Sequence, residues 1–268
     1  MSDIAVQLDN VCFSYEKETV LKNISAEIKE HRICFVMGNN GSGKTTLLKN
    51  IMGFLAPQTG RIMINGRDSS SIDHNVMSRL VSYVPQAIQL NTDFRVIDYL
   101  ALGRTPHSGW LNKLKDSDYE IIDKYALRFG IEKCLEIEFN KLSGGQKQMV
   151  AIVRSLIQDT PIIILDEPMS ALDMGKQVDM LKAFWELTIE GKTVIMTTHN
   201  PNHAISVTSD ACFMKQGKVV TYGRSNEIIN KAILHEIYGE NITLDHGKYD
   251  SVVFDTDLIL EDQLKENG

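Results

Sequence analysis

The segment that follows an apolar run reads Gly38-Asn39-Asn40-Gly41-Ser42-Gly43-Lys44-Thr45, which matches the pattern G-x-x-x-x-G-K-[ST]. Glycines in such a turn let backbone N–H groups curl around phosphate oxygens without interference from a Cβ atom. A helix that begins at Lys44 directs its positive end at the same anion. Lys44 is then the point charge for the β and γ phosphates, and the Thr45 hydroxyl is placed to ligate Mg²⁺. The segment from Gly38 to Thr46 therefore predicts a nucleoside triphosphate site.

Runs of apolar residues at 32–37, 162–165 and 193–197 predict strands around this turn. They are almost continuously apolar, which is typical of parallel strands buried on both faces. A helical pattern follows the first of them, at 44–53. Such an alternation of strands and helices indicates an α/β fold.

The middle of the chain carries helical patterns at 96–103, 116–129 and 144–158, with no strand pattern between 83 and 161. We expect an all-helical subdomain over 87–160, inserted into a core made of 1–86 and 161–238. Alternating segments at 24–28 and 61–65 predict a small antiparallel sheet against that core. A further helix is expected over 226–238.

Charge is concentrated at the end of the chain, where residues 239–268 carry eight acidic residues and two lysines. Segments 242–244 and 249–254 flank turn residues there and predict a hairpin. A solvated tail or exposed hairpin is one interpretation of 239–268, and a charge-based docking surface is the other.

Composition excludes several classes of protein. With 43% hydrophobic and 24% charged residues in 268, the chain resembles an ordinary soluble globular protein. Its apolar runs are far shorter than the roughly 20 residues of a membrane span, and residues 1–9 show no signal peptide pattern. The net charge of −7 argues against a nucleic-acid surface. No two cysteines have the close spacing of a zinc site or a redox pair, since they are Cys12, Cys34, Cys134 and Cys212.

Two carboxylates directly follow the strand predicted at 162–165. Ligands in parallel sheets bind beyond the carboxyl ends of the strands. Asp166 would then face Mg²⁺, and Glu167 would orient and polarise an attacking water. His199 follows the strand at 193–197. From the residues alone, His199 is either structural or a hydrogen-bond donor to the γ-phosphate.

The pentapeptide Leu142-Ser143-Gly144-Gly145-Gln146 resembles the signature of ATP-binding cassette (ABC) transporters, in their nucleotide-binding subunit. Other residues resemble further motifs of this family, and they follow one another along the chain in the same order as in the family. Tyr15 resembles the aromatic residue that stacks on adenine, and Gln86 resembles the glutamine that links the metal site to the helical insertion. The loop from Ser170 to Asp173 resembles the one that crosses between two subunits, and His199 resembles the histidine on the γ-phosphate.

This resemblance implies a P-loop NTPase (RecA-like) core that uses ATP and Mg²⁺. It implies a catalytic set of Glu167, His199, Lys44 and Gln86, and metal contacts from Thr45, Gln86 and Asp166. Ser143 can cap the helix that follows, and Gly144, Gly145 and Gln146 leave a second phosphate-binding helix start open. In the family, this signature meets the phosphate loop of a second copy in a head-to-tail homodimer.

A finer resemblance lies in Ala101-Leu102-Gly103-Arg104-Thr105-Pro106-His107, which is similar to a segment of importer ATPases for iron–siderophore, haem, cobalamin and molybdate or tungstate cargo. A plain helix end explains the same residues, with Gly103 as C-cap, Arg104 near the dipole and Pro106 as a stop.

The importer reading implies membrane permease subunits that dock near 86–110, with Trp110 as a contact, and an external binding protein that acts indirectly. It places the chain peripherally on the cytoplasmic face of the inner membrane. The alternative from another class is a soluble ABC-type ATPase of iron–sulfur cluster assembly. An exporter also stays open.

Overall fold

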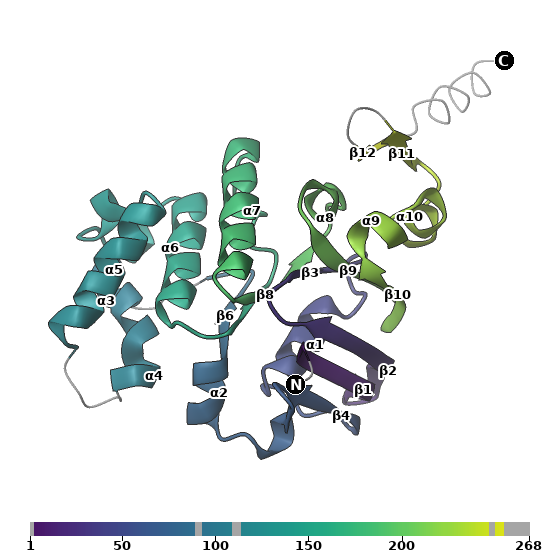
Figure 1. The fold of residues 1–268 in the computed structure, drawn as a ribbon, viewed down its shortest axis with the longest axis horizontal. Coiled ribbons are helices and arrows are strands. Elements are labelled where there is room, and N and C mark those ends of the chain that lie inside the picture. The colour runs from purple at the N-terminus through teal and green to yellow at the C-terminus, as the bar shows by residue number, and fades with distance from the viewer. Residues whose placement is uncertain (1–2, 89–92, 109–113, 247–249, 255–268) are drawn as a thin grey trace. The chain divides into compact units, whose positions relative to one another are not determined.

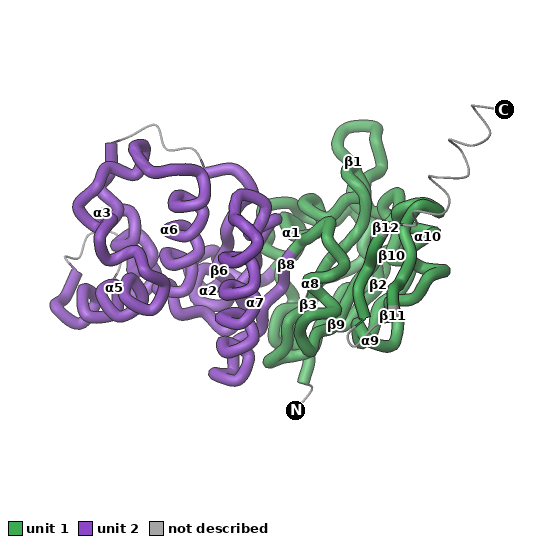
Figure 2. The backbone as a smooth tube through the Cα atoms, turned by 90° about the horizontal axis from the view of Figure 1, so that it is seen from above, with its two compact units in different colours: residues 1–70, 197–268 green, residues 71–196 purple. Residues whose placement is uncertain are grey.

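The computed structural model describes residues 3–88, 93–108, 114–246 and 250–254. The chain forms two compact units, one of Met1–Ser70 with Thr197–Gly268 and one of Ser71–Met196, drawn in green and purple in Figure 2. Each unit has its own buried strands and its own helices, so we describe each by itself.

An antiparallel sheet occupies the first unit, in the strand order β2-β1-β4-β5. Its strands are β1 (Ile4–Tyr15), β2 (Glu18–Lys29), β4 (Thr59–Ile64) and β5 (Arg67–Asp68). On β1, the side chains of Val6, Leu8 and Val11 are buried against the core. This confirms the small antiparallel sheet, although β1 and β2 are longer than the sequence patterns suggested.

The phosphate-loop strand β3 (Ile33–Met37) lies in the same unit and pairs in parallel with β9 (Ser209–Lys215). Every residue of β3 is at most 1% exposed, as its continuous apolar run predicted. Helix α1 (Lys44–Ile51) follows β3 after the glycine-rich turn. Strand β10 (Lys218–Arg224) pairs antiparallel with β9, and neither strand was predicted.

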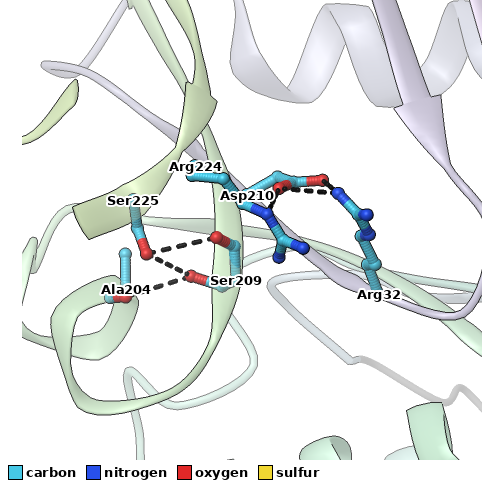
Figure 3. A network of polar contacts seen from close by, with 6 residues as sticks. All are labelled: Arg32, Ala204, Ser209, Asp210, Arg224 and Ser225. Carbon is cyan, nitrogen blue, oxygen red and sulfur yellow. Dashed lines mark hydrogen bonds and ion pairs between the residues drawn. The ribbon is translucent and has the colours of Figure 1, made fainter. Parts of the chain in front are cut away.

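Polar contacts join these strands at their ends (Figure 3). Asp210 on β9 pairs with Arg32 at 3.3 Å and with Arg224 at 3.5 Å. Next to it, the hydroxyls of Ser209 and Ser225 are hydrogen-bonded at 3.0 Å. The buried carboxylate of Asp210 is thereby compensated by two guanidinium groups, as a buried charge requires.

The C-terminal part of the first unit contains α8 (Asn202–Ser206), α9 (Ser225–Ile228), α10 (Lys231–Tyr238), β11 (Ile242–His246) and β12 (Asp250–Phe254). Strands β11 and β12 form the expected hairpin. The Asn202 amide accepts from the backbone N–H of Val252 at 2.7 Å and donates to its carbonyl at 3.1 Å. The hairpin is therefore anchored to α8, and residues 255–268 of the predicted hairpin or tail at 239–268 lie outside the described residues.

The second unit holds the parallel strands β6 (Val81–Val84) and β7 (Ile162–Leu165) and residues 193–196 of the parallel strand β8 (Thr193–Thr198). Both β7 and β8 are buried along their whole length, as predicted. Strand β6 was not predicted. It follows α2 (His74–Leu80), while α7 (Met174–Ile189) connects β7 to β8.

A helical bundle lies between β6 and β7 in the sequence. It comprises α3 (Val96–Ala101), η2 (Leu102–Arg104), α4 (Thr105–Ser108), α5 (Asp116–Arg128), η3 (Glu132–Cys134), η4 (Phe139–Lys141) and α6 (Gly144–Ile157). Helices α3, α5 and α6 pack against one another (Figure 1). The expectation that Pro106 stops a helix is wrong, because Pro106 lies in the first turn of α4, where a missing N–H is tolerated.

Candidate nucleotide-binding site

The turn between β3 and α1 has a backbone that only glycine can adopt at two positions. Gly38 has a φ of +148°, and a Cβ atom there would lie 2.2 Å from the carbonyl oxygen of Met214. Gly43 is left-handed, with a φ of 101°, and occupies the cap position of α1 without a side chain to close it. No side chain therefore caps the N-terminus of α1, which is the end of a helix that favours an anion.

The polar side chains of Ser42 and Lys44 are buried in this turn, which we call the phosphate cradle. Lys44 is 6% exposed, and its Nζ donates to the carbonyl oxygens of Gly38 at 2.8 Å and Asn39 at 3.1 Å. The buried Ser42 hydroxyl has no hydrogen-bond partner within the described part of the chain. A buried hydroxyl without a protein partner, in a turn that also holds an ammonium and a helix N-terminus, fits a phosphate oxygen.

Helix α10 contacts the same loop. The sequence patterns did not predict this contact. The side-chain amide of Asn39 donates to the carbonyl oxygen of Ile237 at 2.7 Å. Burial raises the pKa of the adjacent Tyr238 hydroxyl, and the backbone of Gly38 is near enough to oppose that rise. No local motif announces these contacts, because almost 200 residues separate Asn39 from Ile237.

Tyr15 and His199 belong to the same unit as the phosphate loop. Tyr15 is 43% exposed, and its ring makes a T-shaped contact with the ring of Phe13 at a centroid distance of 4.9 Å. His199 follows β8 on an exposed turn. Beside it, burial and the nearby His199 lower the pKa of His203 to about 4.

The second unit holds Asp166 and Glu167 at the carboxyl end of β7. Asp166 is 2% exposed, and its backbone N–H donates to the carbonyl of Val84 on β6 at 2.9 Å. Glu167 has a φ of 47°, a left-handed conformation that costs energy for a residue with a side chain. Ser170 stabilises this turn with a hydroxyl hydrogen bond of 2.9 Å to the Glu167 carbonyl.

Two of the predicted site residues meet directly here. Nε2 of Gln86 donates to Oε2 of Glu167 at 3.2 Å. Gln86 lies just after β6, so this contact links the carboxylate to the start of the helical insertion. In the strand before Gln86, burial raises the pKa of Tyr83 to about 12, and the charge of Asp166 adds to the rise.

The signature residues form the N-terminus of α6. The Ser143 hydroxyl accepts from the Gln146 backbone N–H at 3.3 Å, and the Gln146 side chain accepts from the Ser143 N–H at 2.9 Å. This reciprocal capping box confirms that Ser143 caps the helix. A Cβ atom on Gly145 would lie 3.1 Å from the Ala171 carbonyl oxygen, so α6 closely approaches the loop after Glu167.

The predicted site residues divide between the two units. The phosphate loop, Tyr15 and His199 belong to the first, and Gln86, Asp166, Glu167 and the signature residues to the second. Trp110 lies outside the described residues. None of the helices described in either unit is long and apolar enough to cross a bilayer.

Comparison with known proteins gives one consistent result. Residues 21–170 match the family described as ABC transporter. A petrobactin import ATP-binding protein of Bacillus subtilis is 31% identical over 89% of this chain and 94% of its own length. A manganese transport system ATP-binding protein of Synechocystis is also 31% identical, over 89% of this chain and 92% of its own length.

Among solved structures, a chain of a proposed metal-chelate type ABC transporter in an inward-facing conformation superposes with a TM-score of 0.82. The match covers 96% of this chain and 99% of that chain at 24% identity, so it establishes the shared fold.

Proposed function

Because this chain belongs to the ABC transporter family, as an ATPase subunit, we propose that it powers the import of a metal chelate or a related cargo. The relatives that import petrobactin and transport manganese support a metal-linked cargo. Iron–siderophore, haem, cobalamin and molybdate or tungstate are the cargo classes that we propose. The likeness of the segment from Leu102 to His107 to importer ATPases supports the same direction of transport.

ATP binding uses the loop from Gly38 to Thr46 in this proposal. The N-terminus of α1, the Lys44 ammonium and the Ser42 hydroxyl receive the phosphates, and Tyr15 stacks on adenine. Thr45, Gln86 and Asp166 would hold Mg²⁺, which when bound neutralises charge on the transferring phosphoryl group. Among the described residues, no group of three His, Cys, Asp or Glu side chains could hold a metal.

Hydrolysis depends on Glu167 as the residue that orients the attacking water. Its carboxylate accepts a hydrogen bond from Gln86, and we propose that this bond orients it. Lys44 and His199 stabilise the charge that develops on the γ-phosphate. Transport follows if two copies close around ATP, with Ser143, Gly144, Gly145 and Gln146 of each copy on the other's nucleotide.

Permease subunits dock on the helical subdomain in this proposal, at the described segment from Ala101 to His107, and an external binding protein delivers cargo to them. This places the chain on the cytoplasmic face of the membrane. The hydrogen bond between Gln86 and Glu167 is the observation that carries the mechanism, because it joins the hydrolytic carboxylate to the subdomain that receives the permease.

The variant Glu167→Gln tests this mechanism. It should bind ATP, fail to hydrolyse it, and accumulate as an ATP-dependent dimer in size-exclusion chromatography with light scattering. Full turnover by Glu167→Gln would refute the role of the carboxylate. A chain that binds ATP but stays monomeric would refute the closed dimer.

A further inference from the structure

The segment from Leu102 to His107 is hydrogen-bonded to the C-terminal end of the signature helix α6. Nη1 of Arg104 donates to the carbonyl oxygen of Ile157 at 2.9 Å. Nε2 of His107 lies 2.7 Å from the carbonyl oxygen of Gln158 and must donate, because a carbonyl only accepts. The last carbonyls of a helix have no partner within it and carry its negative dipole end. Arg104 and His107 supply donors to these carbonyls, and the Arg104 guanidinium also supplies a positive charge.

Close packing reinforces this link. Gly103 is buried, and a Cβ atom there would lie 2.6 Å from the carbonyl oxygen of Arg154 on α6. The η2 turn can therefore approach the helix backbone only with glycine at this position. This approach brings Arg104 within reach of the end of α6.

The Arg104 guanidinium is fixed from its other side. Its Nε pairs with Oδ1 of Asp118 at 2.8 Å, and the two side chains are only 11% and 8% exposed. The other Asp118 oxygen accepts from the Lys115 backbone N–H at 3.0 Å, at the start of α5. The hydrogen bond from Arg104 holds the pKa of Asp118 below its usual range, with help from Lys115. Arg104 thus joins α5 to α6 through charge-assisted hydrogen bonds.

The same segment also reaches the elements that lead to Gln86. Nε of Arg79 on α2 donates to the carbonyl oxygen of Pro106 at 2.8 Å. At the end of α6, Gln158 Nε2 donates to the carbonyls of Ser78 at 2.6 Å and of Val81 at 3.3 Å. Val81 begins β6, and β6 ends two residues before Gln86.

We propose that Arg104 and His107 are positioning residues that hold the C-terminal end of α6 in the place where Gln158 contacts α2 and the start of β6. The signature residues at the other end of α6 and Gln86 beyond β6 then move as one body with the segment from Leu102 to His107. This inference rests on the proposed roles of Gln86 and the signature residues. A partner that presses on this segment would shift both motifs together.

ATP-dependent dimerisation of the full chain in the Glu167→Gln background tests the inference. We add Arg104→Lys, which keeps the positive charge. It loses the planar guanidinium that donates to Asp118 and to the Ile157 carbonyl at the same time. In a second chain we add His107→Ala. His107 is exposed, so this chain should fold. His74→Ala is the matched control, because His74 is another exposed histidine of the same unit.

We expect both variants to weaken the ATP-bound dimer about tenfold, whereas His74→Ala leaves it unchanged. Binding of trinitrophenyl-ATP to each chain should stay within about twofold of the parent, since the phosphate loop is intact. With Glu167 restored, kcat should fall and KM for ATP should hold. His107→Gln, which keeps an amide donor, should recover most of the lost dimer affinity.

The outcomes separate this inference from the proposed function. Parent-like dimers from both Arg104→Lys and His107→Ala would overturn the positioning role. A parallel loss of thermal stability and nucleotide binding would also overturn the positioning role, because the contacts would then serve only to keep the chain folded. If Glu167→Gln alone forms no ATP-dependent dimer, the proposed function fails instead.

Discussion

Gln86 and Glu167 are in direct contact, with Nε2 of the amide 3.2 Å from Oε2 of the carboxylate. The two residues lie 81 positions apart in the sequence and follow neighbouring parallel strands, β6 and β7. The carboxyl ends of parallel strands share one edge of a sheet, where ligands bind. A movement of the helical insertion that displaces Gln86 therefore changes the orientation of Glu167 directly.

Removing the amide should impair hydrolysis more than binding. Gln86→Ala frees the Glu167 carboxylate to adopt other rotamers, so fewer molecules hold water for in-line attack. We expect kcat for ATP hydrolysis to fall about tenfold or more, in the range of positioning effects on catalysis. KM should change less than about threefold. Steady-state ATPase kinetics measure both, and an unchanged kcat would show that the contact has no role in the reaction.

The buried Ser42 hydroxyl should strengthen ATP binding and lower the stability of the nucleotide-free chain. Ser42→Ala removes a buried polar atom that lacks a partner within the described residues, so the nucleotide-free chain should keep or gain up to about 1 kcal/mol. ATP affinity should fall about five- to tenfold. Ser155→Ala is the control, because its buried hydroxyl donates to Ile152 at 2.7 Å. That variant should lose about 1 kcal/mol and keep its ATP affinity. Chemical denaturation measures the stability of each variant, and calorimetric titration measures its ATP affinity. A destabilised Ser42→Ala variant with normal ATP affinity would contradict a role of the Ser42 hydroxyl in phosphate binding.

Gly38 should be irreplaceable, for steric reasons. In Gly38→Ala the new Cβ would lie 2.2 Å from the Met214 carbonyl oxygen, so the turn must move and ATP binding should be lost. Gly66→Ala is the matched control, because Gly66 also has a positive φ, of +74°, and its Cβ would meet nothing within 4 Å. The control should cost about 1 to 2 kcal/mol of stability and leave ATP affinity intact. Equal affinities for the two variants would contradict this account of the turn.

Stability should depend on pH through His203. Its folded pKa is about 4 against an ordinary 6.5, so the unfolded chain binds more protons between these values. The free energy of unfolding should therefore rise from pH 4 to pH 6.5, by about 1 to 2 kcal/mol once solvent screening is allowed for. His203→Gln should remove this dependence, whereas His74→Gln, at an exposed histidine, should retain it. A pH profile of His203→Gln that matches the parent would assign the effect to other groups.

Much of the fold could be predicted because its signals are local. Continuous apolar runs predicted β3, β7 and β8, and the capping residue Ser143 correctly placed the start of α6. Strand β10 was missed because its residues are only half-buried and follow no clear alternation. Strand β9 is almost wholly buried, yet it includes Ser209 and Asp210, whose partners cannot be read from the sequence.

In the site, too, local patterns could be predicted from the sequence and long-range contacts could not. The glycine pattern predicted the cradle, but only the structure shows the left-handed turn of Glu167 and the contact of Asn39 with α10. For the segment from Leu102 to His107, the helix-end interpretation was wrong for its own helix, which continues through Ser108, yet Arg104 does lie at a helix C-terminus. That C-terminus is the one of α6, more than 50 residues further along the chain. Long-range contacts of this kind leave no local periodicity.

Co-purification with membrane proteins tests the importer account most directly. The tagged full chain is isolated from detergent-solubilised membranes alongside two variants at exposed leucines, Leu102→Glu in the docking segment and Leu127→Glu on α5, where the parent side chains are 37% and 72% exposed. We predict a polytopic membrane protein in equal amount with the parent and with Leu127→Glu, but not with Leu102→Glu. Recovery of soluble iron–sulfur assembly proteins alone, regardless of Leu102, would contradict the account.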